Sequence, residues 1–111
     1  MDTVSTSDFE GERLAREPRT ALVVFVADWC GYSRRFLRAA EPQAEGFPAP
    51  VLLADVSDED DPLWDRFRLR IVPSLVLFKD GEPVWRMDGR SLVGLPPTAL
   101  DEARKALEAA R

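Results

Sequence analysis

Residues 22–33 read LVVFVADWCGYS, and this stretch decides the fold. The run from Thr20 to Ala27 is apolar and β-branched without alternation, which predicts a strand buried on both faces of a sheet. Apolar residues at helical spacing in Gly31–Glu41 predict a helix that ends at Pro42. Cys30, the only cysteine, is therefore expected at the junction between a central strand and the N-terminus of a helix.

The segment before this strand predicts a short helix over Ser7–Glu17, because Ser7 suits an N-cap and a proline follows Glu17. Residues 1–6 are expected either to fray or to form a short edge strand. Further along, Pro50–Val56 indicates a second buried strand, and residues 58–69 (DEDDPLWDRFRL) indicate a helix with an acidic start.

The C-terminal part predicts a hairpin and a last helix. Residues 74–89 (SLVLFKDGEPVWRMDG) predict two antiparallel strands around an Asp-Gly turn. Residues 96–111 predict an amphipathic helix with a Thr98–Asp101 capping box. This order of elements predicts an α/β fold of three layers, α/β/α, with about four helices and a central mixed sheet of about four to five strands.

The composition of the chain excludes several classes of function. The 111 residues suit one domain over residues 1–111, and a net charge of −5 argues against nucleic acid and anionic membranes as partners. One cysteine and no histidine exclude an internal disulfide, His-assisted catalysis and a zinc site. The N-terminus has no apolar run, so we expect the protein in the cytoplasm. We also expect a monomer without metal or cofactor, whose partners are protein or low-molecular-weight thiols.

Three segments in this order, LVVFVADWCGYS, IVPSLVLFKDGEPV and then Gly89, resemble the thioredoxin family over nearly the whole chain. The resemblance implies a thioredoxin fold, with catalytic positions at Cys30 and Ser33 and a cis Val72–Pro73 bond facing the cysteine. It also implies a substrate groove, formed by Trp29, Gly31, Tyr32, Ile71, Val72, Pro73 and Gly89. The helix dipole, with Arg34 and Arg35 nearby, is expected to favour the Cys30 thiolate.

The departures from the family pattern concern proton handling and release. Ser33 replaces the second, resolving cysteine, so a mixed disulfide at Cys30 cannot be discharged by its neighbour. The family's buried acid, six residues before the nucleophile, corresponds to Val24, and its lysine on the adjacent strand corresponds to Leu53. A serine introduced by engineering to trap adducts would give the same motif, but it would leave both charges in place.

Three functions remain open at this point. In the first, Cys30 is a monothiol nucleophile that forms mixed disulfides for thiol exchange or isomerisation. In the second, the fold is a non-catalytic peptide-binding or co-chaperone module. The third is a monothiol glutaredoxin-like protein with an iron–sulfur cluster and glutathione, because CGYS is similar to the CGFS of that family. The role of Arg34, Arg35 and Arg38 also stays open, because they form either a solvent-exposed face or a site for acidic partners. Trp64 is expected in the core.

Overall fold

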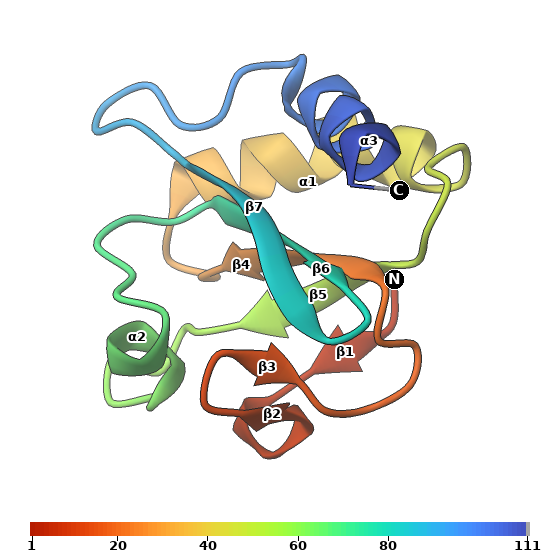
Figure 1. Ribbon diagram of the computed structural model, residues 1–111. Helices are drawn as coiled ribbons and strands as arrows, with labels where there is room; N and C mark the ends of the chain where they lie inside the picture. Colours follow the sequence, from red (N-terminus) through yellow and green to blue (C-terminus); the bar gives the residue numbers. More distant parts are fainter. Residues whose placement is uncertain (111) are drawn as a thin grey trace.

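A five-stranded sheet forms the centre of the computed structural model, which describes residues 1–110 (Figure 1). The strand order is β1 (Thr3–Val4), β5 (Val51–Asp55), β4 (Ala21–Val26), β6 (Ser74–Lys79), β7 (Glu82–Asp88). β4 pairs in parallel with β5, which pairs in parallel with β1, whereas β6 is antiparallel to both β4 and β7. The predicted mixed sheet is confirmed, and residues 3–4 form the edge strand rather than a frayed end.

Strand β4 is central because both of its faces are apolar. Ala21, Val23 and Phe25 point into one hydrophobic cluster, while alternate residues point into a second cluster on the other face. Every residue of the strand is buried. The strand lies between the two halves of the core, as its unbroken apolar sequence predicted, and its neighbours β5 and β6 also send residues into both clusters.

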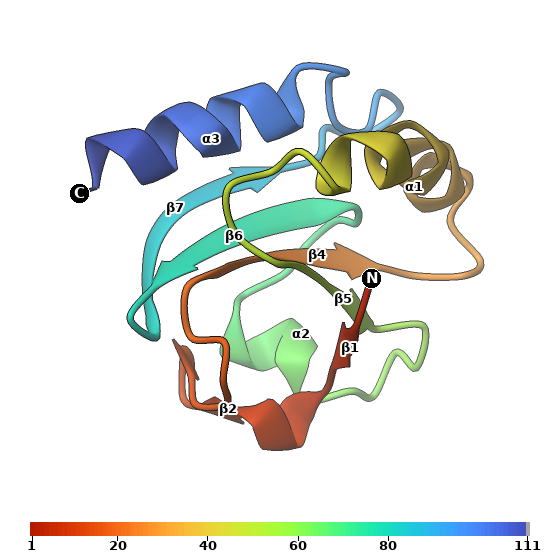
Figure 2. The same cartoon turned by 90° about the vertical axis from the view of Figure 1, so that its right-hand side faces the viewer.

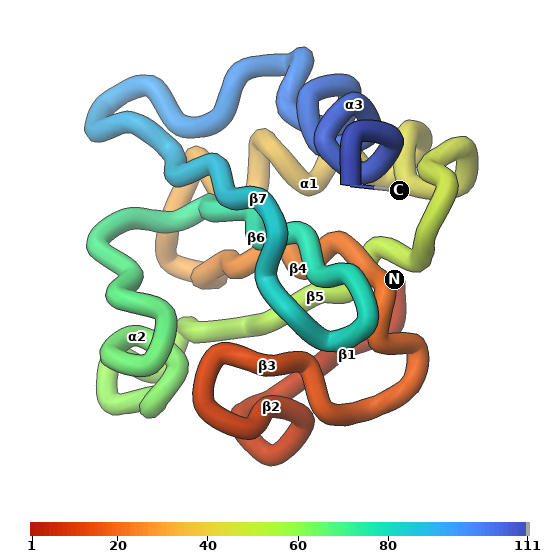
Figure 3. Tube along the Cα trace, in the orientation of Figure 1, coloured from red at the N-terminus to blue at the C-terminus, as the bar shows by residue number. Residues whose placement is uncertain are grey.

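Helices α1 (Gly31–Ala44) and α3 (Ala99–Ala109) cover one face of the sheet (Figure 2). The other face carries the short helix α2 (Leu63–Arg66) together with a small hairpin formed by β2 (Phe9–Glu10) and β3 (Arg13–Leu14). The tube view shows this red hairpin and the green α2 side by side below the sheet (Figure 3). The three-layer arrangement is therefore confirmed.

The helix predicted over Ser7–Glu17 is wrong. After the short 3-10 turn Thr6–Asp8, residues 9–14 fold as the β2–β3 hairpin, and Gly11 at its turn has φ +58°. Phe9 and Leu14 lie opposite each other in register, and both are buried. On a helix, residues five apart would point about 140° away from each other, so only the hairpin brings both side chains to the core. Residues 1–110 consequently hold three α-helices rather than about four.

Other helices also differ from expectation. The helix expected in residues 58–69 is limited to the four residues of α2. Pro42 lies inside α1, which continues to Ala44, so the proline costs the Arg38 carbonyl its usual backbone donor without ending the helix. Thr98 is the N-cap of α3, but its side chain makes no capping hydrogen bond. The Asp80–Gly81 hairpin and the apolar stripe of α3 are as predicted.

The junction between β4 and α1 lies at one end of the molecule, and the N-terminus and the C-terminal end of α3 lie at the other (Figure 1). Within residues 1–110 no helix combines the length and apolar character needed to cross a bilayer.

Candidate functional site

Cys30 lies in the turn that connects β4 to α1. It is the N-cap residue of α1, and its extended backbone (φ −99°, ψ 115°) starts the helix at Gly31. The carbonyl oxygen of Cys30 accepts from the backbone N–H of Arg34 at 3.2 Å, which closes the first helical turn. Because Cys30 is the N-cap, its sulfur sits at the positive end of the α1 dipole. The residue is half-buried, so the thiol remains within reach of solvent.

The segment facing Cys30 directly precedes β6. The thiol donates a hydrogen bond to the carbonyl oxygen of Val72, with 3.5 Å between Sγ and oxygen. The Val72–Pro73 peptide bond is cis. The carbonyl of Pro73 accepts from the backbone N–H of Gly89 at 3.0 Å, and a Cβ at position 89 would lie 2.6 Å from that oxygen. Only glycine leaves room here, so Gly89 supports the segment that faces the sulfur.

Ser33 lies on the inner side of the first turn of α1. Its side chain is 1% exposed, and Oγ accepts a hydrogen bond from the backbone N–H of Ala27 at 3.3 Å. Val24 and Leu53 are partners in the register of β4 and β5, and Val24 is fully buried. The two positions assigned to proton-handling charges in the family are thus neighbours, and both side chains are apolar.

Trp29 forms an exposed wall beside the cysteine. Its indole is 53% exposed, and Nε1 donates to the carbonyl oxygen of Ser57 at 2.9 Å. The ring stacks on Trp64, with centroids 6.4 Å apart and an interplanar angle of 9°. Trp64 is half-buried and donates from Nε1 to the Val56 carbonyl at 3.1 Å. Trp64 packs against the core cluster on this side of the sheet, as expected, and in addition supports the ring of Trp29.

On the opposite side of Cys30, Tyr32 packs against the loop that follows β7. The Cα of Gly94 lies so close to the Tyr32 ring that a Cβ there would be 3.2 Å from it. Arg35 places its guanidinium 5.2 Å from the centre of the same ring and donates to the carbonyl oxygen of Val93 at 2.6 Å. Sequence reasoning missed this loop, since nothing in residues 90–94 indicates a contact with α1.

The structure therefore gathers most of the predicted groove residues. Cys30, Val72, Pro73 and Gly89 are joined by the contacts above. Trp29 and Tyr32 flank the cysteine from either side, with Gly31 exposed between Cys30 and Tyr32 and Ile71 half-buried next to Val72. Arg34 donates to the carbonyl oxygen of Asp28 at 2.7 Å and so braces the turn that holds Trp29 and Cys30.

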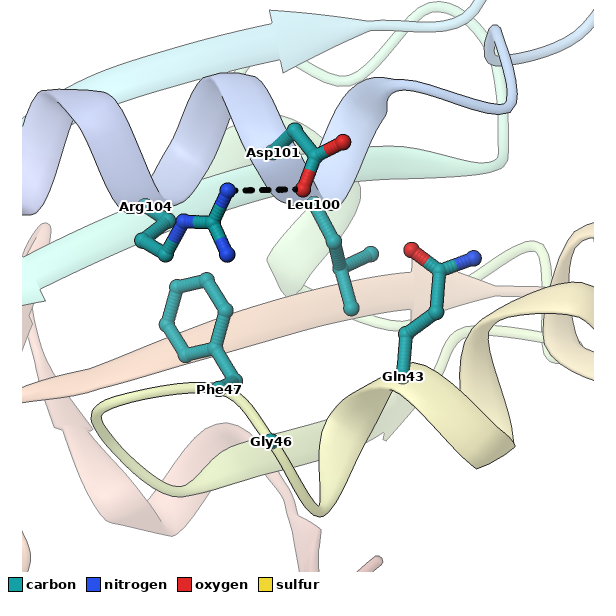
Figure 4. A pocket seen from close by; sticks show the side chains of 6 residues that line it. All are labelled: Gln43, Gly46, Phe47, Leu100, Asp101 and Arg104. Atoms are coloured by element: carbon teal, nitrogen blue, oxygen red, sulfur yellow. Dashed lines mark ion pairs between the residues drawn. The ribbon is translucent and has the colours of Figure 1, made fainter.

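A separate hollow of about 210 Å³ lies between the C-terminal end of α1 and α3 (Figure 4). Gln43, Phe47 and Leu100 line it, and Arg104 pairs with Asp101 at 3.1 Å on its rim. This hollow is at the far end of α1 from Cys30 and shares no residue with the predicted groove.

Comparison with known proteins gives a consistent result. The family model of thioredoxin matches residues 1–94. A thioredoxin from Alicyclobacillus acidocaldarius is 30% identical, with 94% of this chain and 95% of that protein covered. A thioredoxin-like protein from Synechocystis is 32% identical over 79 residues, which cover 70% of this chain and 75% of the relative.

Among solved structures, oxidised mitochondrial thioredoxin 3 from Saccharomyces cerevisiae superimposes with a TM-score of 0.73 at 21% identity, covering 95% of this chain and 93% of that one. This likeness confirms the predicted thioredoxin fold. The chain belongs to the thioredoxin family. Within that family its single cysteine sets it apart from a Cys-x-x-Cys protein.

Proposed function

We propose that this chain is a monothiol member of the thioredoxin family, in which Cys30 forms mixed disulfides with protein or low-molecular-weight thiols. The observation that carries the proposal is the position of Cys30. The residue is the N-cap of helix α1, and its sulfur lies 3.5 Å from the Val72 carbonyl oxygen. A half-buried thiol at a helix N-terminus has the environment that promotes nucleophilic cysteine.

The proposed step is a thiol–disulfide exchange. The thiolate of Cys30 attacks one sulfur of a partner disulfide, a bond forms between Sγ and that sulfur, and the partner's S–S bond breaks. The second partner sulfur leaves as a thiolate and takes a proton from water. No net oxidation or reduction occurs, because one disulfide replaces another.

Release in this proposal needs an outside thiol. A serine hydroxyl cannot attack the mixed disulfide, and the Ser33 hydroxyl is held by the N–H of Ala27 in the buried side of the turn. A small thiol or a second protein thiol therefore attacks the adduct and restores Cys30. A reducing compartment such as the cytoplasm supplies such thiols, which agrees with the expected localisation.

The test is adduct formation by the purified chain. Incubated with oxidised glutathione, and separately with a peptide disulfide, the wild-type protein is expected to gain one adduct by intact-mass spectrometry, and Cys30→Ser none. Added reduced glutathione is expected to remove the adduct. A wild-type protein that reacts no faster than a free cysteine-containing peptide would overturn the proposal.

A second candidate is a binding module that uses the same face without covalent chemistry. The exposed Trp29, held rigidly by its hydrogen bond to Ser57 and its stack on Trp64, is the observation that favours it. Capture of the same partners by wild type and by Cys30→Ala would support binding alone, whereas loss of capture in Cys30→Ala supports the monothiol function.

The glutaredoxin-like alternative makes a different prediction. It requires visible-region absorption after anaerobic reconstitution with iron, sulfide and glutathione. A colourless protein after that treatment removes this alternative and leaves the monothiol proposal unaffected.

A further inference from the structure

The described arginines near Cys30 form no ion pair, whereas most of the other cationic side chains do. Within residues 1–110, the six ion pairs all involve cations outside the site. The remaining cations outside the site donate to backbone carbonyls. In the same part of the chain, three exposed arginines have side chains with neither an ion pair nor a hydrogen bond, and these are Arg38, Arg70 and Arg90.

These three residues lie around the candidate site. Arg38 is on α1, one turn beyond Arg35, and Arg90 directly follows Gly89. Arg70 precedes Ile71 on the segment that leads to Val72. Arg35 adds a fourth positive charge, bound only to the Val93 carbonyl and the Tyr32 ring. The unpaired positive charge thus lies on the Tyr32 side of Cys30, whereas the Trp29 side carries the acids Asp28, Asp55 and Asp58.

The loop after β7 brings apolar side chains to this same end. Arg90 and Gly94 exchange two backbone hydrogen bonds, of 3.0 Å and 2.8 Å, which hold residues 91–93 as a tight tip. Leu92 at that tip is 83% exposed and has φ +64°, and Val93 is 55% exposed. A leucine that is both solvated and held in a backbone region favouring glycine gains nothing from the folding of this chain.

A hollow of about 280 Å³ continues from this loop onto α1. Phe36, Leu95 and Pro97 form much of its wall, and Tyr32 and Arg35 stand on the side nearest Cys30. Arg35 lines the hollow and also binds the Val93 carbonyl, so the hollow adjoins the loop tip. Arg38 follows one turn along the same helix, and Arg90 stands at the base of the same loop. We call it the loop–α1 surface, defined by Arg35, Arg38, Arg90, Leu92 and Val93 with the hollow beside them.

We propose that the loop–α1 surface docks an acidic protein segment that carries an apolar side chain, and thereby selects the partners whose sulfur reaches Cys30. The proposal rests on the proposed monothiol function for its purpose, but the docking itself needs no thiol. Charge complementarity identifies the occupant. The nearest acid on β7, Asp88, is neutralised by its 2.7 Å pair with Arg86, so the surface presents its positive groups to an approaching carboxylate.

The occupant also has an apolar part, because the exposed Leu92 and Val93 and the hollow offer contacts that a purely charged segment leaves unused. A basic segment is disfavoured twice: the surface repels it, and the acidic remainder of the protein attracts it elsewhere. Acidic and apolar together therefore define the partner segment.

The first experiment measures docking without covalent chemistry. The full-length Cys30→Ala chain is titrated into three fluorescein-labelled, cysteine-free 12-residue peptides, and anisotropy is followed at low and physiological salt. One peptide is rich in Asp and Glu around a central Leu-Phe pair, the second replaces every acid with Lys, and the third keeps the acids but replaces the pair with Ser. The first is expected to bind at least about tenfold more tightly than either of the others, and more weakly as salt rises.

Matched variants then locate the binding. Leu92→Asn keeps a residue that tolerates positive φ, and it is expected to weaken binding about threefold by removing apolar contact. Arg90→Glu and Arg38→Glu are each expected to weaken binding about tenfold. Lys105→Glu on α3 makes the same change in net charge and is expected to leave binding within about twofold. Equal binding of the Lys-rich peptide, or equal effects of Arg90→Glu and Lys105→Glu, would overturn the proposal.

A second readout separates this inference from the proposed function. The wild-type chain is mixed with disulfide-linked versions of the acidic and the Lys-rich peptides, and adduct formation is timed by mass spectrometry. Adducts that form at the same rate with both peptides overturn the docking proposal and keep the monothiol function. Docking to Cys30→Ala with no adduct in the wild type keeps the docking proposal and overturns the monothiol function.

Discussion

Ser33 and Ala27 are joined by a hydrogen bond in which the backbone N–H of Ala27 donates to the Oγ of Ser33 over 3.3 Å. Ala27 follows the last residue of β4, and Ser33 lies in the first turn of α1. The bond therefore ties together the two elements whose junction carries Cys30. The family pattern places a second thiol three residues after the nucleophile. In this chain the hydroxyl at that position instead makes a hydrogen bond that supports the fold.

Replacing this hydroxyl is expected to weaken the fold. Ser33→Ala leaves the buried N–H of Ala27 without its partner, which should lower the free energy of unfolding by about 1–2 kcal/mol. Urea unfolding followed by circular dichroism measures the change. Ser91→Ala, at an exposed loop position, is the control and should stay within about 0.5 kcal/mol of wild type. Equal stabilities of the two variants would show that the Ser33 bond contributes nothing.

Restoring a thiol at the same position is expected to shorten the life of adducts. In Ser33→Cys the new sulfur lies in the same helical turn as Cys30, so it can attack the mixed disulfide without an outside thiol. We expect the adduct to decay at least about tenfold faster, because the attack becomes intramolecular. Intact-mass spectrometry in thiol-free buffer gives the decay rate, with Ser33→Ala as the control for altered packing. An unchanged lifetime would mean that the two sulfurs do not meet.

Gly89→Ala is expected to disturb the segment that faces Cys30. The added Cβ would lie 2.6 Å from the Pro73 carbonyl oxygen, a distance at which the backbone must move. Overpacking of this kind costs about 1–3 kcal/mol, and the shift should also slow adduct formation at Cys30. Gly46→Ala meets no atom closer than 3.8 Å and serves as the control. A Gly89→Ala protein with wild-type stability and adduct rate would contradict the packing described here.

The two stacked tryptophans are expected to differ in their effect on stability. Trp64→Ala removes a half-buried ring and two hydrogen bonds to backbone carbonyls, of 3.1 Å and 3.2 Å, and should cost about 2–3 kcal/mol. Trp29→Ala removes a ring that is 53% exposed and should cost less than about 1 kcal/mol. Thermal and urea unfolding of both variants measure the order. The reverse order would mean that Trp29, rather than Trp64, supports the wall beside Cys30.

The sequence predicted correctly those strands, turns and helices whose signal lies within a short stretch of residues. The unbroken apolar run of β4, the Asp80–Gly81 hairpin and the apolar stripe of α3 each lie within a short stretch of sequence, and each is present. The predicted N-terminal helix is wrong because Phe9 and Leu14, five residues apart, cannot both face the core from one helix. That spacing suits a hairpin, which the conformation of Gly11 permits.

The site was predictable in part, for a similar reason. The facing of Cys30 by Val72, 42 positions apart in sequence, followed from the family resemblance and not from any periodicity. The contact between Arg35 and Val93 joins residues 58 positions apart in a loop without a motif, and no sequence pattern indicates it. Trp64 packs against the core as expected, but its stack on Trp29 was not predictable, because an aromatic residue on a short helix does not reveal which neighbour it meets.

The positions of the chain ends make this molecule convenient to handle. Because the N-terminus and the end of α3 lie opposite the β4–α1 junction, an affinity tag or a surface linkage at the N-terminus holds the molecule by the side away from Cys30 (Figure 1). An immobilised chain then faces a cell extract with its cysteine, its tryptophan wall and its loop all free. The fold thus permits bait experiments in which the handle does not compete with the partner.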